Sequence, residues 1–306
     1  MPNGANNISN FVPEIWSKKL ALVEKTMTNF INDFANREWE GEIKSFGDTV
    51  RISLPDPDNI ILGTGIVADA SAVAPTQKTL VIDKSRNVAF KFNDVEQAQS
   101  QFNLIEGYLA MGMQKMQDAI SLELQQAIFD DANVEAVGTS ALPTAVTVNN
   151  VYDFVVDLKV KLTERGVLSS EGYYTFKGAQ EEAKQLKPML CVTPKVYGMF
   201  LKSTHLTHPT VAGDDILKSG ERKQIAGFEI MQDTNIANVT GTASNAQPFI
   251  AGTKMGITFA NQFQKVEALR DLDSFADIVR ALQLYGFAII QPKSLVKGFV
   301  NITSGN

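Results

Sequence analysis

Two stretches of the chain repeat their apolar residues at three- and four-residue steps, which is the spacing of an amphipathic helix. The first covers residues 11–34, after a polar start, and has Pro13 near its beginning, where a helix tolerates proline. The second begins after Asn93 or Asp94 and runs without proline to Asp131. It predicts a continuous helix of about 28 residues, about 42 Å long, which is unusual in a globular domain.

Between these two helices the pattern changes to that of strands. In residues 49–54, apolar and polar side chains alternate, and residues 79–92 are rich in β-branched and aromatic side chains. The intervening residues 55–79 are rich in Pro, Asp, Asn, Gly and small side chains, and connections of this length usually serve a purpose in a compact domain. We therefore expect the two limbs to pair as a long hairpin that carries a projecting loop.

The remainder of the chain mixes helices and strands. One helix is predicted from Asn149 or Asn150 to Gly166, and another begins with Thr193 as its cap and Pro194 in its first turn. Short apolar runs predict strands at residues 189–192, 228–231, 248–252, 255–260, 275–290 and 295–302, and residues 205–225 are typical of a loop. Because helices and strands do not alternate regularly, the pattern favours the α+β class.

Composition excludes several broad classes of protein. The chain has 306 residues, 28 Lys and Arg against 34 Asp and Glu, and a net charge of −6, so its overall field repels phosphate. This balance argues against a dedicated nucleic-acid binder. The single cysteine, Cys191, cannot form a disulfide within the chain. The start of the sequence lacks the pattern of a secretory signal, and no apolar run is long enough to span a bilayer, so we expect a soluble protein.

One segment resembles a dinucleotide-binding motif. Residues 59–68, NIILGTGIVA, place Gly63 and Gly65 in a G-x-G-x-x-A pattern after a strand-like run, and Asp83 follows Gly63 by twenty positions. The helix that this motif requires is missing from the pattern, because the next residues have no large apolar side chain and Pro75 interrupts them. A Gly-rich projecting hairpin is favoured, and an NAD-type oxidoreductase built on Gly63 and Gly65 is kept as an alternative.

Candidate metal ligands are few. His205 and His208 are spaced like a ligand pair, but no second pair accompanies them, so exposed loop histidines are the favoured interpretation. Asp271, Asp273 and Asp277 begin like a calcium loop, which needs Gly at its sixth position and Glu at its twelfth, and this sequence has neither. We expect no catalytic, cofactor-binding or metal-binding residue, no cofactor and no enzyme activity.

The order of the predicted elements resembles the major capsid (coat) proteins of tailed bacteriophages, which have the Hong Kong 97-type fold that encapsulins share. Four segments carry the resemblance: FVPEIWSKKLALVEKTMTNF at 11–30, NREWEGEIKSFGDTVRIS at 36–53, LVIDKSRNVAFKFNDVEQAQS at 80–100 and RALQLYGFAIIQPKSLVKGF at 280–299. Their order and spacing are more specific than any one of them. The likeness covers most of the chain and is weakest over residues 169–187 and 205–243.

The resemblance implies a division of the chain into five parts of an α+β capsid fold. They are an N-arm at 1–45, an extended E-loop hairpin at 46–92, a peripheral domain with a spine helix at 93–145, an axial domain at 146–271, and return strands to the peripheral domain at 272–306. Certain relatives join their subunits through a lysine in the E-loop, and residues 52–77 contain no lysine.

The resemblance also implies a function. It predicts a structural subunit that self-assembles, through hexamers and pentamers, into an icosahedral or prolate head shell around double-stranded phage DNA, without sequence-specific binding and without a membrane. A separate scaffolding protein, a portal and optional decoration proteins are the implied partners. The implied location is the virion capsid, after assembly in the host cytoplasm. An encapsulin-like compartment, which holds protein cargo instead of a genome, is the nearest alternative.

Overall fold

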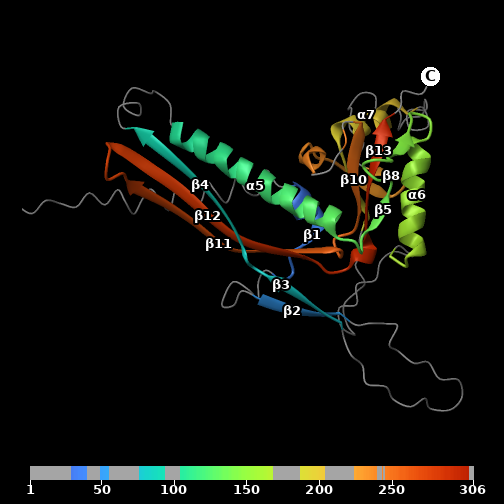
Figure 1. Ribbon diagram of the computed structural model, residues 1–306, viewed down its shortest axis with the longest axis horizontal. Coiled ribbons are helices and arrows are strands. Elements are labelled where there is room, and N and C mark those ends of the chain that lie inside the picture. The colour runs from blue at the N-terminus through green and yellow to red at the C-terminus, as the bar shows by residue number, and fades with distance from the viewer. Residues whose placement is uncertain are drawn as a thin grey trace, which may run out of the picture.

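The computed structural model describes residues 29–39, 49–54, 76–93, 104–167, 187–203, 224–239, 243 and 245–302. In this part of the chain, helices and strands build one long sheet, a second sheet and a two-stranded sheet (Figure 1). This mixture confirms the α+β class. The helices are α2 (Asn29–Phe34), α5 (Leu104–Asp130), α6 (Val151–Glu164) and α7 (Pro194–Lys202), with short 3-10 helices η2 (Asn235–Asn238) and η3 (Pro292–Ser294).

The long sheet has a hairpin of two 14-residue strands at its centre. Its strands follow the order β1-β11-β12-β4, where β11 and β12 are antiparallel, β4 is antiparallel to β12, and β1 is parallel to the start of β11. Helix α5 runs along this sheet in Figure 1. The strands are β1 (Ala35–Asn36), β4 (Lys84–Asn93), β11 (Ile257–Arg270) and β12 (Ala276–Ile289).

The second sheet forms the other end of the molecule. Its path is β5-β13-β10-β7-β9-β8, and β6 also pairs with β13. Every residue of β7 and β10 is buried, because helices cover both faces of the sheet. Its strands are β5 (Glu135–Val137), β6 (Thr144–Val146), β7 (Met189–Val192), β8 (Gln224–Ile225), β9 (Phe228–Gln232), β10 (Ala246–Gly252) and β13 (Leu295–Ile302).

Helix α5 connects the two sheets through one hydrophobic core. Its buried residues recur at helical spacing, as its sequence predicts, and they pack against apolar side chains of both sheets. The opposite face of the second sheet packs against α6 and α7 in a separate core. The buried apolar residues of α5 are Leu109, Met113, Met116, Ile120, Leu124 and Ile128. Since one rigid helix contributes to both sheets, their relative position is fixed by its packing.

The predicted hairpin is confirmed only in its first part. Strand β2 (Thr49–Leu54) pairs antiparallel with β3 (Thr76–Val81), from Thr49 opposite Val81 to Leu54 opposite Thr76. The chain then leaves this pair at Ile82, and β4 pairs with β12 in the long sheet. The return limb of the hairpin is therefore divided between two sheets.

The other predicted elements agree with the structure where they are described. Helix α5 has 27 residues, and Gly166 adopts a φ of +70° directly after Arg165, the C-cap of α6, as a helix-ending glycine does. Thr193 precedes α7 but does not cap it with its side chain, because its hydroxyl donates to Gln247 Oε1 at 3.0 Å. Of the N-terminal helix predicted at 11–34, only α2 lies within the described residues.

Candidate functional site

Most residues of the predicted enzyme-like motifs lie outside the described part of the chain. This holds for Gly63, Gly65, His205 and His208. Asp83 is described and is exposed at the junction of β3 and β4. The strand before it is antiparallel to β2, whereas a dinucleotide fold uses parallel strands. No group of three or more potential metal-ligating side chains is found among the described residues.

The aspartates that resemble a calcium loop lie in the turn of the β11–β12 hairpin. Asp271 accepts a hydrogen bond from Ser274 Oγ at 2.6 Å and forms an ion pair with Lys91 of β4. The hydrogen bond from Lys91, with that from Ser274, lowers the pKa of Asp271 to about 2. Asp277 accepts from Arg270 at 3.0 Å. These carboxylates therefore neutralise neighbouring cations and close the turn.

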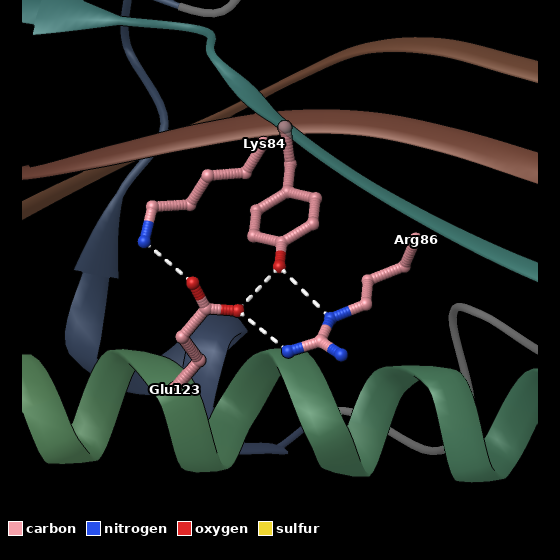
Figure 2. Close-up of polar contacts among 4 residues, drawn as sticks. Lys84, Arg86 and Glu123 are labelled. Atoms are coloured by element: carbon pink, nitrogen blue, oxygen red, sulfur yellow. Dashed lines mark hydrogen bonds and ion pairs between the residues drawn. The ribbon is translucent and has the colours of Figure 1, made fainter.

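The most connected polar cluster lies where α5 crosses the long sheet. Glu123 of α5 accepts from Lys84 Nζ at 2.5 Å, from Tyr285 Oη at 2.6 Å and from Arg86 Nη2 at 3.0 Å (Figure 2). Arg86 Nε also lies 3.4 Å from Tyr285 Oη. The three partners come from β4 and β12, so a single carboxylate joins the helix to two strands.

Electrostatics in this cluster favour the ionised carboxylate. Burial opposes ionisation of Glu123, but hydrogen bonds from Lys84, Tyr285 and Arg86 outweigh it and lower the pKa of Glu123 to about 2. Burial and the neighbouring carboxylate raise the pKa of Tyr285 to about 12. At neutral pH the tyrosine therefore remains a hydrogen-bond donor and the cluster carries two positive charges against one negative charge. The cluster is structural, since all of its carboxylate contacts are to side chains of the same fold.

The base of the β2–β3 arm is attached to the long sheet by a small hydrophobic core. Ile52, Leu80 and Ile82 pack against Ala260 of β11 and Ile290, which follows β12. At the same place the backbone of the β3–β4 junction crosses Gly286 of β12. A Cβ atom at this glycine would lie 2.1 Å from the carbonyl oxygen of Val81, so this crossing requires a residue without a side chain.

Exposed apolar side chains gather at the turn of the β11–β12 hairpin. Leu272 is 99% exposed and Phe275 is 83% exposed, and Leu269 before them is also exposed. Two carboxylates of this region are paired, Asp271 with Lys91 and Asp277 with Arg270. The turn therefore offers apolar side chains beside the exposed Asp273. Nothing in the sequence pattern marks Leu272 or Phe275 as unusual, because only the exposed position of this hairpin turn does so.

Comparison with known proteins gives matches of structure but not of sequence. No protein-family model matches the chain, and no curated protein matches it. A solved structure from Mycobacterium phage Che8 matches with a TM-score of 0.68 and 21% identity, over 89% of this chain and 92% of that chain. The capsid structure of cyanophage P-SCSP1u matches with a TM-score of 0.65 and 11% identity, over 91% of this chain and 89% of that chain.

A further match is the crystal structure of a virus-like particle from Pyrococcus furiosus, with a TM-score of 0.55 and 14% identity, over 94% of this chain and 98% of that chain. These likenesses extend over about nine tenths or more of both chains. They confirm the resemblance seen in the sequence: the chain has the Hong Kong 97-type fold of phage capsid proteins.

Proposed function

We propose that the chain is the major capsid protein of a tailed bacteriophage, a structural subunit that assembles with copies of itself into the head shell. The observation that carries the proposal is the full-length likeness to capsid structures, among them the mature capsid of bacteriophage PhiM1, with a TM-score of 0.59 over 89% of this chain. A likeness over about nine tenths of the chain is not confined to one of its two main sheets.

The surface of the subunit supports assembly. Large exposed apolar patches on a protein usually mark interfaces, and here Leu272 and Phe275 project at the turn of a long hairpin. The arm of β2 and β3 contacts the rest of the chain through a small core at its base. Both features leave surface that a neighbouring subunit can cover.

The proposed roles of the parts follow from the capsid fold. The proposal assigns residues 1–45 to an N-arm, 46–92 to the E-loop, 93–145 to the peripheral domain with α5 as spine helix, 146–271 to the axial domain and 272–306 to the return strands. Three strands fit this division only with an adjustment. Since β4 and β11 pair with β12, they belong with the long sheet beside α5, whereas β13 pairs with β10 and belongs with the second sheet.

The proposal also includes the partners and the location. The subunits form hexamers and pentamers with the help of a separate scaffolding protein, a portal occupies one vertex, and decoration proteins are optional. The shell encloses double-stranded DNA without reading its sequence, which agrees with a net charge of −6. Assembly takes place in the host cytoplasm and the final location is the virion. The subunit has no enzymatic role in this proposal.

A second candidate is an encapsulin-like compartment that holds protein cargo. The match to a virus-like particle from Pyrococcus furiosus favours it as the alternative, although four phage structures match with higher TM-scores. The two candidates share the fold and differ in what the shell contains.

Electron microscopy of the purified chain, expressed with and without a candidate scaffolding protein, tests the proposal. We expect closed shells of megadalton mass. Particles recovered from infected cells should protect DNA from nuclease, whereas particles that hold protein and no DNA would favour the compartment. A chain that remains monomeric under all assembly conditions would refute both candidates. Binding of NAD, measured by fluorescence titration, would instead support the oxidoreductase alternative.

A further inference from the structure

Helix α6 exposes a stripe of side chains opposite its buried face. Its apolar residues point into the core beneath it, while Asp157, Val160 and Glu164 are exposed on the outer side. Val160 is 47% exposed, which is high for a valine in a helix. Neither carboxylate has a hydrogen bond or ion pair within the part of the chain that the structure describes.

Helix α7, which packs in the same core, exposes a stripe of the opposite charge. Lys195 and Lys202 are exposed and, among the described residues, have no hydrogen-bond or ion-pair partner. Gly198 lies between them, and a Cβ atom at this glycine would meet no atom within 4 Å. Both lysines and Gly198 line a shallow hollow whose opposite wall includes Gln247 and Asn301. The helix therefore presents a gap between two cations that have no partner among the described residues.

The two stripes have the same spacing. In α6 the valine follows the first acid by three residues and precedes the second acid by four, and in α7 the glycine lies at the same steps between the lysines. Residues at steps of three and four share one face of a helix, and seven residues span about 10.5 Å along its axis. Two such helices aligned in parallel would place each acid beside a lysine and the valine beside the gap.

We propose that α6 of one subunit docks in parallel on α7 of a neighbouring copy. In this contact Asp157 pairs with Lys195, Glu164 pairs with Lys202, and Val160 fills the gap at Gly198. Within one chain the two stripes do not meet, since none of their four charged residues has a partner among the described residues. The occupant is a second copy because the matching charge, spacing and shape are found on this chain itself.

The contact joins two different surfaces of the same protein, so each subunit can bind one neighbour through α6 and another through α7. Such heterologous contacts close into rings when the rotation permits. The inference therefore rests on the proposed function and deepens it, since it names side chains that join subunits within a ring. An aligned antiparallel contact would shift the valine by one residue from the gap, so the spacing favours the parallel orientation.

Charge exchange tests the pairing. The variants K195E/K202E and D157K/E164K each place like charges in contact, and we expect at least a tenfold loss of assembled particles, measured by sedimentation and electron microscopy. The variant with all four changes restores opposite charges and wild-type net charge, and we expect it to assemble. A matched control, K195E/K202E/D118K/E229K, also keeps the net charge but restores no pairing, so it should remain defective. Circular dichroism confirms that each variant is folded.

Cysteine cross-linking tests the valine–glycine contact separately. The variant V160C/G198C should form disulfide-linked ladders up to a closed ring on oxidation, while V160C alone should form no ladder, since the native Cys191 is buried. The contact would be overturned if K195E/K202E and D157K/E164K both assembled at wild-type yield and assembled V160C/G198C particles formed no ladder. The proposed function would then remain intact. An acidic partner protein on α7 would instead make K195E/K202E defective but leave D157K/E164K normal.

Discussion

At the scale of single residues, the places where elements cross depend on a few side chains with specific chemistry. Glu123 joins α5 to β4 and β12, Lys297 joins the end of α5 to β13, and Gly286 lets the β3–β4 junction cross β12. If any of these residues were replaced, the crossing would contain either a buried polar group without a hydrogen-bond partner or a steric overlap. Each residue therefore supports a measurable prediction about the stability of the unassembled chain.

Glu123→Gln should lower the free energy of unfolding by about 1–3 kcal/mol, because it removes a carboxylate that three side chains share at a partly exposed site. The folded-state pKa of about 2 is below the ordinary value of 4.5, so the carboxylate stabilises the fold fully above pH 4.5 and loses this effect as the pH falls toward 2. Urea unfolding from pH 7 to pH 3 should show this slope in the wild type and a weaker one in the variant. Glu267→Gln, on an exposed ion pair, serves as control.

Gly286→Ala should destabilise the unassembled chain by about 1–3 kcal/mol, because the new methyl group would overlap the backbone of Val81. Gly198→Ala is the matched control. Its position is open and helical, so the same change should stabilise the chain by about 0.5–1 kcal/mol. Thermal unfolding of both variants checks the pair, and equal stability of the two would show that the crossing adjusts without cost.

Lys297→Met should lower the free energy of unfolding by about 1–3 kcal/mol. The buried Lys297 Nζ donates to the carbonyl oxygens of Phe129 and Asp131, at 2.8 and 2.5 Å, at the C-terminal end of α5. Its charge also compensates for acidic residues at a helix end where they are unfavourable. Lys293→Met removes an exposed lysine and should have little effect in the same denaturation measurement.

At the scale of elements, the return limb of the arm shows how one predicted strand region can serve two sheets. Residues 76–81 pair with β2, and the chain then crosses β12 at Gly286 before β4 joins the long sheet. The base of the arm thus has its own small core, while the loop between β2 and β3 lies outside the described residues. Folding of the base and contribution of the loop to assembly can be separated by experiment.

Replacement of residues 55–75 by a short Gly/Ser turn should leave the subunit folded and abolish assembly. Leu54 and Thr76 are paired, so a short turn can join β2 to β3, and loop closure changes by no more than about 1 kcal/mol for such a length change. Thermal unfolding beside sedimentation measures both properties. Closed shells from the variant would refute an interface role for the loop, and an unfolded variant would show that the loop belongs to the core.

At the scale of the whole molecule, a second sheet with its helices lies at one end and a long hairpin projects at the other (Figure 1). Residues of both sheets pack in the core around α5, so the two ends of the subunit keep a fixed position relative to each other. A shell built from such subunits would use contacts at both ends: the charged stripes of α6 and α7 at one, and the apolar hairpin turn with Leu272 and Phe275 at the other.

Mature particles should dissociate into single chains on denaturing gels. Covalent joining through a lysine in the projecting part of the E-loop requires a lysine there, and residues 52–77 have none. The single buried cysteine also provides no exposed thiol for a disulfide between subunits. A ladder of covalent multimers from mature particles under reducing conditions would contradict this prediction and would direct attention to a lysine elsewhere in the chain.

The sequence by itself determined the local elements of this protein. Helical spacing in α5 and α6, the apolar runs of β7, β10 and β13, and a glycine after α6 predict structure through interactions between near neighbours, and all were confirmed. The apolar pattern predicted a strand at 255–260 but not the continuation of β11 to Arg270. The polar residues of this continuation adopt a strand because they pair with β12, and not because they are buried.

Only the tertiary structure decided which distant residues meet. Glu123 and Tyr285 are far apart in the sequence and neither lies in a recognisable motif, so their contact exists only because α5 packs on the long sheet. The same holds for Gly286, whose need for a small residue comes from a backbone that crosses it. The stripes on α6 and α7 are visible in the sequence, but their exposure depends on which face each helix buries in the core. Periodicity fixes which residues share a face, whereas packing fixes what that face contacts.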